Sequence, residues 1–228
     1  MTGRPHPPRD RRPATGGAAA PRQACAALYT AKGGQGCTTT AVALALVVGR
    51  SRRVALVAHN PADVLAIAGQ VPVDGTSSTP LAAGATLVLD PPSGAPVVIH
   101  DAGPTLDTGL LPAGTATYLV TRPCFLALRA AVEHPVHPAG VIVIHEPGRA
   151  ITAHDIEAVL DAPVVATIPV SPAISRRVDA GLLAATLPPA MATALQPLAG
   201  AVGLKPRPVR QPTFHPRTPP TLGATRHW

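Results

Sequence analysis

Short runs of apolar, often β-branched residues alternate along this chain with alanine-rich segments. The apolar runs predict β-strands, and their hydrophobicity is continuous rather than alternating, which indicates strands buried on both faces. We expect these strands near residues 25–30, 53–58, 86–89, 97–101, 117–121, 140–144 and 164–168. Strands of this kind need a layer of helices on each side of the sheet, because parallel strands are joined by crossover connections.

The alanine-rich segments between the strands supply those helices. We expect helices near residues 37–49, 62–69, 124–133, 152–160 and 173–184. Thr152 is followed three residues later by Asp155, a spacing typical of a capping box at the start of a helix. Residues 70–96 are rich in proline, glycine and serine, so we expect little helix there. The order of elements predicts an α/β fold: a doubly wound, mostly parallel sheet with helices on both faces.

The charge of the chain is concentrated at its two ends. The formal net charge is +7, of which residues 1–23 hold +4 and residues 205–228 hold +5, so residues 24–204 carry −2. Both ends are rich in proline and poor in aliphatic residues, and they cannot bury enough apolar surface to offset the entropy cost of ordering. We predict one domain over residues 24–204 between two disordered basic tails, which either contact DNA or anionic lipid or only keep the protein soluble.

Composition also argues against several classes of protein. No apolar run approaches the roughly 20 residues of a membrane-spanning helix, and the N-terminus lacks the apolar segment of a secretory signal. We therefore expect a cytoplasmic protein with no transmembrane segment. The three cysteines, Cys25, Cys37 and Cys124, have spacings that suggest neither a disulfide framework nor a zinc site. The histidines show no metal-ligand spacing, and His100 is expected to be a packed or partly exposed residue rather than a catalytic one.

The segment 31-AKGGQGCTTT-40 has the character of a phosphate-binding loop, between a predicted strand and a predicted helix. Its glycines let backbone N–H groups face phosphate oxygens, and the N-terminus of the following helix adds a partial positive charge. A glycine cluster at this junction also occurs in dinucleotide-binding folds, but the GxGxxG spacing is absent here. We expect ATP with Mg²⁺ to bind at Lys32, Gly33, Gly34, Gln35, Gly36, Cys37, Thr38 and Thr39.

Lys32 and the segment KGGQGCTTT resemble the deviant Walker A loop, KGGxGK followed by Ser or Thr, of the ParA/MinD partition and cell-division-site ATPases, which are P-loop proteins. The resemblance extends over residues 24–200 and includes 97-VVIHDAGP-104, similar to the Walker B strand end of the family. It implies that Lys32 reaches the phosphates of a partner subunit in a nucleotide-dependent homodimer. It also implies that Thr38 and Asp101 serve Mg²⁺, and that loops around Glu146–Pro147 and Pro169–Val170 border the base.

The sequence departs from this family at the positions that serve catalysis. Cys37 replaces the second lysine of the loop, which removes a charge-assisted contact worth about 1.5–3 kcal/mol. In 54-VALVAHNPAD-63 the two acidic positions of the family become Ala58 and Asn60. Asn60 is our candidate for orienting the attacking water, although an amide cannot accept its proton as a carboxylate does. Asp63 is expected to be an acid at a helix N-terminus rather than a substitute for the missing carboxylate.

These observations leave three functions open. The first is a partition or positioning ATPase with weak or absent hydrolysis, in which Lys32 and Asn60 carry what catalysis remains and an activator or cargo protein is the partner. The second is a scaffold that keeps the fold and has lost turnover. The third is a DNA-associated regulator that acts through its basic tails. The proline-rich C-terminal end cannot form the amphipathic basic helix with which some members of the family bind membranes.

Overall fold

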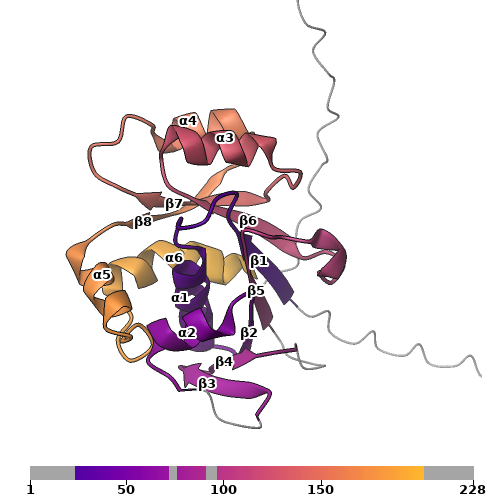
Figure 1. Ribbon diagram of the computed structural model, residues 1–228, viewed down its shortest axis with the longest axis vertical. Coiled ribbons are helices and arrows are strands. Elements are labelled where there is room, and N and C mark those ends of the chain that lie inside the picture. Colours follow the sequence, from indigo (N-terminus) through magenta and orange to yellow (C-terminus); the bar gives the residue numbers. More distant parts are fainter. Residues whose placement is uncertain (1–23, 72–75, 91–96, 203–228) are drawn as a thin grey trace, which may run out of the picture.

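The computed structural model describes residues 24–71, 76–90 and 97–202, and its strands form one eight-stranded sheet in the order β3-β4-β2-β5-β1-β6-β7-β8 (Figure 1). The strands are β1 (Ala24–Tyr29), β2 (Val54–Ala58), β3 (Ser78–Ala82), β4 (Ala85–Val88), β5 (Val97–Gly103), β6 (Ala116–Thr121), β7 (Gly140–His145) and β8 (Val164–Pro169). The helices are α1 (Cys37–Gly49), α2 (Pro61–Ala68), α3 (Phe125–Glu133), α4 (Ala153–Leu160), α5 (Pro172–Asp179), α6 (Pro189–Val202) and the short 3₁₀ helix η1 (Thr108–Leu110).

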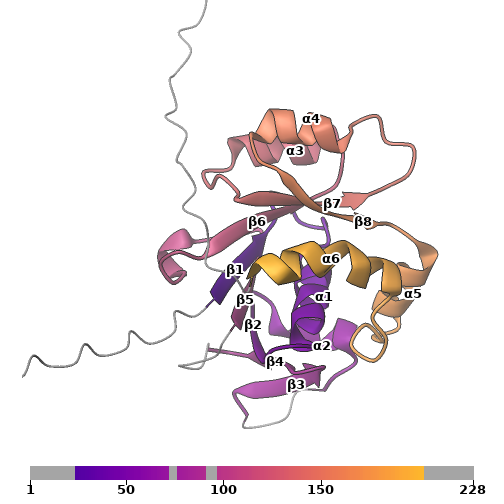
Figure 2. The same cartoon turned by 180° about the vertical axis from the view of Figure 1, so that it is seen from behind.

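Helices cover both faces of the sheet, which confirms the predicted α/β fold. Figures 1 and 2 show α1, α2, α5 and α6 on one face, and α3 and α4 side by side on the other. All neighbouring strands are parallel except β3, which pairs with β4 in the antiparallel direction. In a parallel sheet the carboxyl ends of the strands meet at one edge, and ligands of open α/β sheets bind there.

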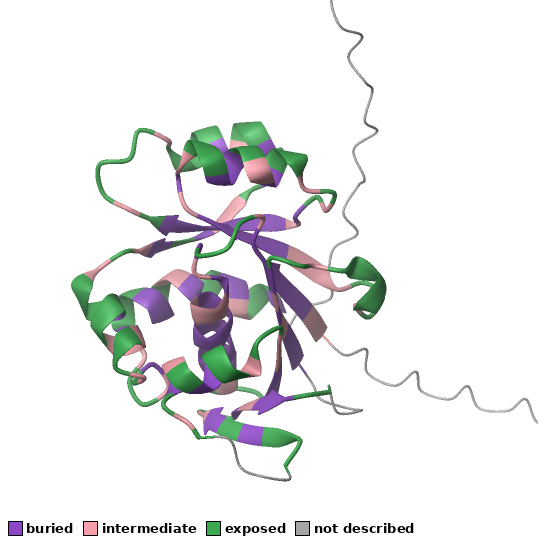
Figure 3. Cartoon of the chain, in the orientation of Figure 1, coloured by how far each residue is buried: buried purple, intermediate pink, exposed green. Residues whose placement is uncertain are grey.

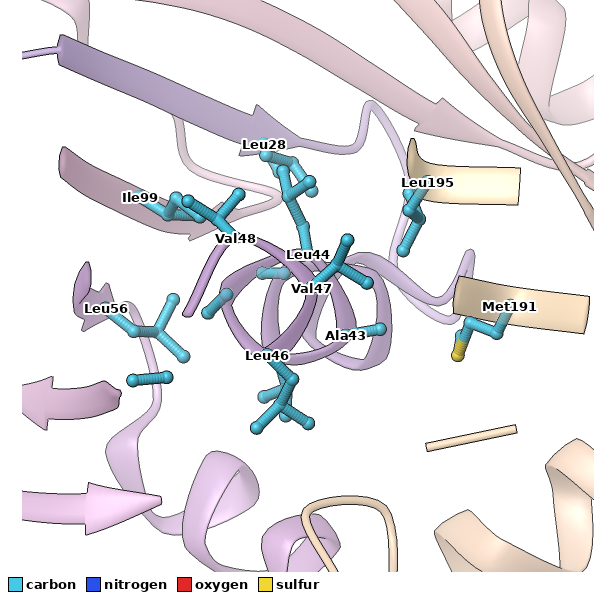
Figure 4. Close-up of a cluster of buried hydrophobic side chains, with 14 of the residues drawn as sticks. Leu28, Ala43, Leu44, Leu46, Val47, Val48, Leu56, Ile99, Met191 and Leu195 are labelled. Atoms are coloured by element: carbon cyan, nitrogen blue, oxygen red, sulfur yellow. The ribbon is translucent and has the colours of Figure 1, made fainter. Parts of the chain in front are cut away.

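Helix α1 is the centre of the larger core and fixes the position of the loop that precedes it. Every side chain from Ala41 to Val48 is at most 3% exposed. Figure 4 shows these side chains surrounded by residues of the sheet and of α6: Leu28, Leu56, Ile99, Met191 and Leu195. A helix that is apolar all round is stable only when it is buried on all sides. Figure 3 shows the contrast with α3 and α4, whose outer faces are exposed.

The hairpin of β3 and β4 replaces a helical connection at one edge of the sheet. Strand β3 was not predicted, because Ser78–Ala82 is short and contains Pro80, which is tolerated only at a sheet edge. Ala83 and Gly84 connect the strands with φ values of 48° and 75°, the positive φ at both positions that a type I′ turn requires. The expectation of little helix in this region therefore agrees with the described residues 76–90.

The C-terminal helices differ from the prediction in two ways. The helix expected over 173–184 ends at Asp179, and Gly181 follows in a left-handed conformation with φ of 64°. A Cβ at Gly181 would lie 2.7 Å from the carbonyl oxygen of Ala66, so this turn is fixed by its approach to α2. Helix α6 was not predicted, because Pro197 lies inside it. Its buried residues Met191, Leu195 and Leu198 pack in the core and outweigh the hydrogen bond that the proline removes.

The structure also bears on the cysteines, on His100 and on membrane-spanning helices. All three cysteines are free thiols. His100 lies on β5 with its Nε2 atom buried and without a hydrogen-bond partner among the described residues, and this burial lowers its pKa. None of the helices in the described ranges is long and apolar enough to cross a membrane. The predicted tails, residues 1–23 and 205–228, lie outside the described residues.

The predicted capping box at the N-terminus of α4 is present, and its contribution to stability can be tested. The Thr152 hydroxyl accepts the Asp155 N–H at 3.2 Å, and the Asp155 carboxylate accepts the Thr152 N–H at 2.8 Å. Replacing Thr152 by alanine should lower the free energy of unfolding by about 1 kcal/mol. Urea denaturation of this variant measures the effect, with Thr186→Ala, an exposed threonine in the turn before α6, as the control. Equal midpoints for the two variants would contradict the prediction.

Candidate functional site

The loop between β1 and α1 forms an open cradle at the carboxyl edge of the sheet. Gly34 and Gly36 adopt φ values of 78° and 88°, which other residues rarely reach. A Cβ at Gly33 or Gly34 would have no atom within 4 Å, so nothing in the described protein fills the space above the loop. The carbonyl of Gly36 accepts hydrogen bonds from both the N–H and the hydroxyl of Thr40, in the first turn of α1. The loop is therefore open around Gly33 and Gly34, directly before the N-terminus of α1.

The remaining loop residues lie where the phosphate-loop prediction requires them. The Thr30 hydroxyl donates to the carbonyl of Lys32 at 2.7 Å, which fixes the start of the loop, and Lys32 itself is exposed. The Gln35 side chain is 8% exposed and points into the protein. Thr38 and Thr39 are half-buried in the first turn of α1. An exposed Lys32 agrees with a role outside its own subunit, which stays a prediction.

Cys37 and Asp101 are buried against each other beneath the loop. Cys37 is 5% exposed and Asp101 is 2% exposed. Burial raises the pKa of the Cys37 thiol, and the neighbouring Asp101 carboxylate raises it further. One carboxylate oxygen of Asp101 accepts the Gly103 N–H at 3.3 Å, and the other, Oδ2, is buried with no hydrogen-bond partner among the described residues. Cys37 therefore carries no charge, and Asp101 keeps an unsatisfied oxygen beside the loop.

The unsatisfied oxygen of Asp101 fits a divalent cation. A carboxylate and a threonine hydroxyl are oxygen ligands of the type that Mg²⁺ prefers, and Mg²⁺ normally completes its shell with phosphate and water. Thr38 is the second residue of α1 and follows Cys37, which contacts Asp101. Within the described ranges there is no group of three or more His, Cys, Asp or Glu side chains that could hold a metal ion without such help.

Asn60, our candidate for orienting water, has a structural role that sequence reasoning missed. Its side-chain oxygen accepts the N–H of Ala62 at 3.2 Å and so caps the N-terminus of α2. Asp63 lies in the first turn of the same helix, the position expected for it. Between Ala58 and Asn60, His59 donates its N–H to the carbonyl of Asp101 at 2.7 Å. The loop after β2 is thus held next to β5, the strand that carries Asp101. The side-chain oxygen of Asn60, however, already accepts a hydrogen bond from α2.

A cavity of about 180 Å³ opens beside the loop. Gly36, Thr39 and Thr40 form its loop side, and residues of β7, β8, α5 and α6 form its largely apolar remainder, among them Ile144, Ile168, Pro169, Val170, Ile174 and Met191. An apolar cavity with a few polar groups next to a phosphate cradle has the character of a pocket for a planar base. Pro169 and Val170 line this cavity, whereas Glu146 and Pro147, which the family resemblance also places at the base, are not among its described lining residues. That the cavity holds the base stays a prediction.

Arg122 is the site residue that sequence reasoning missed. It directly follows β6 and lines the cavity. Its N–H donates to the Gln35 side chain at 3.0 Å, and its guanidinium donates to Glu146 at 2.8 Å. Arg149 also binds Glu146, with 2.6 Å between Arg149 Nε and the carboxylate. These two arginines, Arg149 first, hold the pKa of Glu146 below its usual range. The signal in the sequence was a cation at the carboxyl end of a buried strand, where ligands of such sheets bind.

Comparison with solved structures identifies the fold that carries this site. With a TM-score of 0.63 and 18% identity, the chain is similar to the septum site-determining protein MinD from Pyrococcus horikoshii, solved with Mg-ADP, over 79% of this chain and 96% of that one. The chain has the MinD/ParA fold. A ParA family ATPase from Chlorobium tepidum matches with a TM-score of 0.58 and 16% identity, over 77% of this chain and 99% of that one.

A third structure extends the likeness to another member of the MinD/ParA group. An ATP complex of a McdA variant from Cyanothece matches with a TM-score of 0.61 and 14% identity, over 82% of this chain and 99% of that one. No protein-family model matches the sequence, and no curated protein matches it. The MinD/ParA fold is thus kept while the sequence has diverged widely, which confirms at the level of fold the resemblance seen in KGGQGCTTT.

Proposed function

We propose that this chain is a nucleotide-binding positioning protein of the MinD/ParA type, with weak or absent ATP hydrolysis. The observation that carries the proposal is the open glycine cradle at the N-terminus of α1, next to an apolar cavity. Residues Lys32 to Thr39 would hold the phosphates, and the cavity would hold the base. Mg²⁺ would be held by Thr38 and Asp101, and when bound it neutralises phosphate charge.

Two residues are the reason for proposing weak or absent ATP hydrolysis. Cys37 is a neutral, buried thiol where the family has a second lysine, so it contributes no positive charge to the phosphates. Asn60 lacks a carboxylate, and its oxygen caps α2. In this function the nucleotide acts as a structural ligand or a slow switch, and a second copy of the chain and an activator or cargo protein are its partners. A scaffold that binds nucleotide and never hydrolyses it is the limiting case.

Nucleotide binding is tested by filling the cradle. Replacing Gly34 by valine puts a branched side chain into the space above the loop, and we expect the Kd for Mg-ATP to rise at least about tenfold because phosphate oxygens then cannot approach the backbone N–H groups. Calorimetric titration of the full chain with ATP and ADP, with and without Mg²⁺, gives the measurement.

Gly114→Val is a matched control for this experiment. Gly114 also has a positive φ, 82°, and a Cβ there would also meet no atom within 4 Å, so both variants carry similar backbone strain. It lies in the turn before β6, remote from the loop in the sequence. If Gly114→Val weakens ATP binding as much as Gly34→Val, the effect is one of folding. If the unchanged protein binds no nucleotide, the proposed function is wrong.

The tails provide a separate prediction about nucleic acid. Together residues 1–23 and 205–228 hold +9, against −2 on the rest of the chain. If they contact DNA, binding should fall steeply between about 50 and 200 mM salt, because neutralised phosphates release counterions. Fluorescence anisotropy with a random duplex measures this, and a chain of residues 24–204 should lose binding. DNA binding retained by residues 24–204 would place the contact on the folded part instead.

A further inference from the structure

Arg122 stands at the junction of the loop, the cavity and the strand β7. Its backbone is tied to the loop through the Gln35 side chain, and its side chain lines the same cavity as Gly36 and Thr39. Among the described residues that line this cavity, Arg122 is the only one with a positive charge. A cation so placed faces the region where the phosphate cradle meets the pocket for the base.

The guanidinium of Arg122 is only partly satisfied. Its Nη1 donates to Glu146, while its Nε is buried and has no hydrogen-bond partner within the described ranges. The Arg122 side chain is 41% exposed, so its outer face remains open to the cavity and to solvent. A guanidinium has five donors in a fixed plane and favours bidentate contacts with carboxylates and phosphates. Arg122 therefore has donors in reserve for an anion that enters the site.

Glu146 does not depend on Arg122 alone. Its second carboxylate oxygen is bound by Arg149 through both Nε and Nη2. If Arg122 leaves the pair, Glu146 keeps a bidentate partner, so the cost of the exchange is small. The three side chains together carry +1. Asp179, at the end of α5, is the other charged residue among the described residues that line the cavity, so the positive charge that attracts a polyphosphate is on the Arg122 side.

Resting on the proposed function, we propose that Arg122 binds the phosphates of the nucleotide in place of the cation that is missing at Cys37. Polyphosphate would draw the guanidinium away from Glu146, and the Arg122–Glu146 pair would be the resting state of a switch. Exchange of this partner links the occupied loop to the segment 146–151 that leads from β7 to α4. Arg122 would thus recognise the charged phosphates of the nucleotide and not its uncharged base.

Three variants of the full chain test this exchange by calorimetric titration with Mg-ATP. Arg122→Met keeps the length of the side chain and removes its charge, and we expect the Kd to rise tenfold to a hundredfold. Glu146→Gln frees Arg122 from its resting partner, so the Kd should fall. Arg129→Met is the matched control, because it removes an arginine that is likewise paired with a glutamate, Glu133, but lies outside the cavity lining, and its Kd should change by less than threefold.

The response of Glu146→Gln separates binding from a structural role. If Arg122 only braced the loop through Glu146, this variant would weaken ATP binding as Arg122→Met does, and the proposal would be overturned. Titration with Mg-pyrophosphate should show the same loss for Arg122→Met, and a loss confined to ATP would instead assign Arg122 to the base. If the unchanged protein binds ATP and Arg122→Met binds it equally, this inference fails while the proposed function stands.

Discussion

Replacing Cys37 by lysine and Asn60 by aspartate together should raise the rate of phosphate release by at least about a hundredfold over the unmodified protein. Hydrolysis needs charge neutralisation at the γ-phosphate and an oriented water, and this chain lacks the residue that normally serves each need. Because both losses act on one transition state, their effects need not add, and the double variant should exceed either single variant. Steady-state phosphate release with saturating Mg-ATP measures the rate.

The structure provides a control for the Asn60→Asp change in this double variant. Asn60 caps α2 through its side-chain oxygen, and aspartate and serine cap a helix about as well as asparagine. Asn60→Ser therefore preserves the fold without adding a carboxylate, and in the Cys37→Lys background it should not raise turnover. Rapid phosphate release by the unmodified protein, abolished by Lys32→Ala, would show that Lys32 carries catalysis and that weak hydrolysis is the wrong conclusion.

Cys37→Lys alone should lower the Kd for Mg-ATP by about 10- to 100-fold, the equivalent of one charge-assisted hydrogen bond, because the new charge adds to the one that Arg122 supplies from the cavity side of the loop. The position is 5% exposed and lies between the loop and the Asp101 carboxylate, so a lysine there has a counter-charge when the site is empty and phosphate when it is full. Calorimetric titration measures the Kd, and the melting temperature checks that the buried lysine is tolerated.

Cys37→Met separates the charge of the new side chain from its bulk. Methionine fills a similar path without a charge, so it should bind ATP no more tightly than the unmodified protein. Equal tightening by Met and Lys would mean that packing, not charge, limits binding. No tightening by Lys would mean that another cation, Lys32 or Arg122, already occupies the position that the family gives to its second lysine.

The sequence predicted the elements that bury a continuous apolar run or carry a local signal. Helix α1 begins and ends where its apolar run predicted, because a helix with no polar face has only one stable environment. The capping box of Thr152 and Asp155 was equally local. Short elements with prolines escaped prediction: β3 contains Pro80, and α6 contains Pro197 and is held by long-range packing. Propensity argues against these two elements, and only tertiary contacts outweigh it.

Some features of the site could likewise be predicted from local sequence, and others depend on long-range contacts. The glycines of KGGQGC specify an open phosphate cradle by themselves, because conformational freedom and the absence of a Cβ are properties of single residues. The sequence also showed that Cys37 lacks a charge. The helix cap of Asn60 is a local contact as well, since its side chain accepts the N–H of Ala62 two residues on. Only the tertiary structure decided that Arg122 meets Gln35 across 87 residues of sequence. Partners so far apart are set by the order of strands in the sheet, which no local pattern encodes.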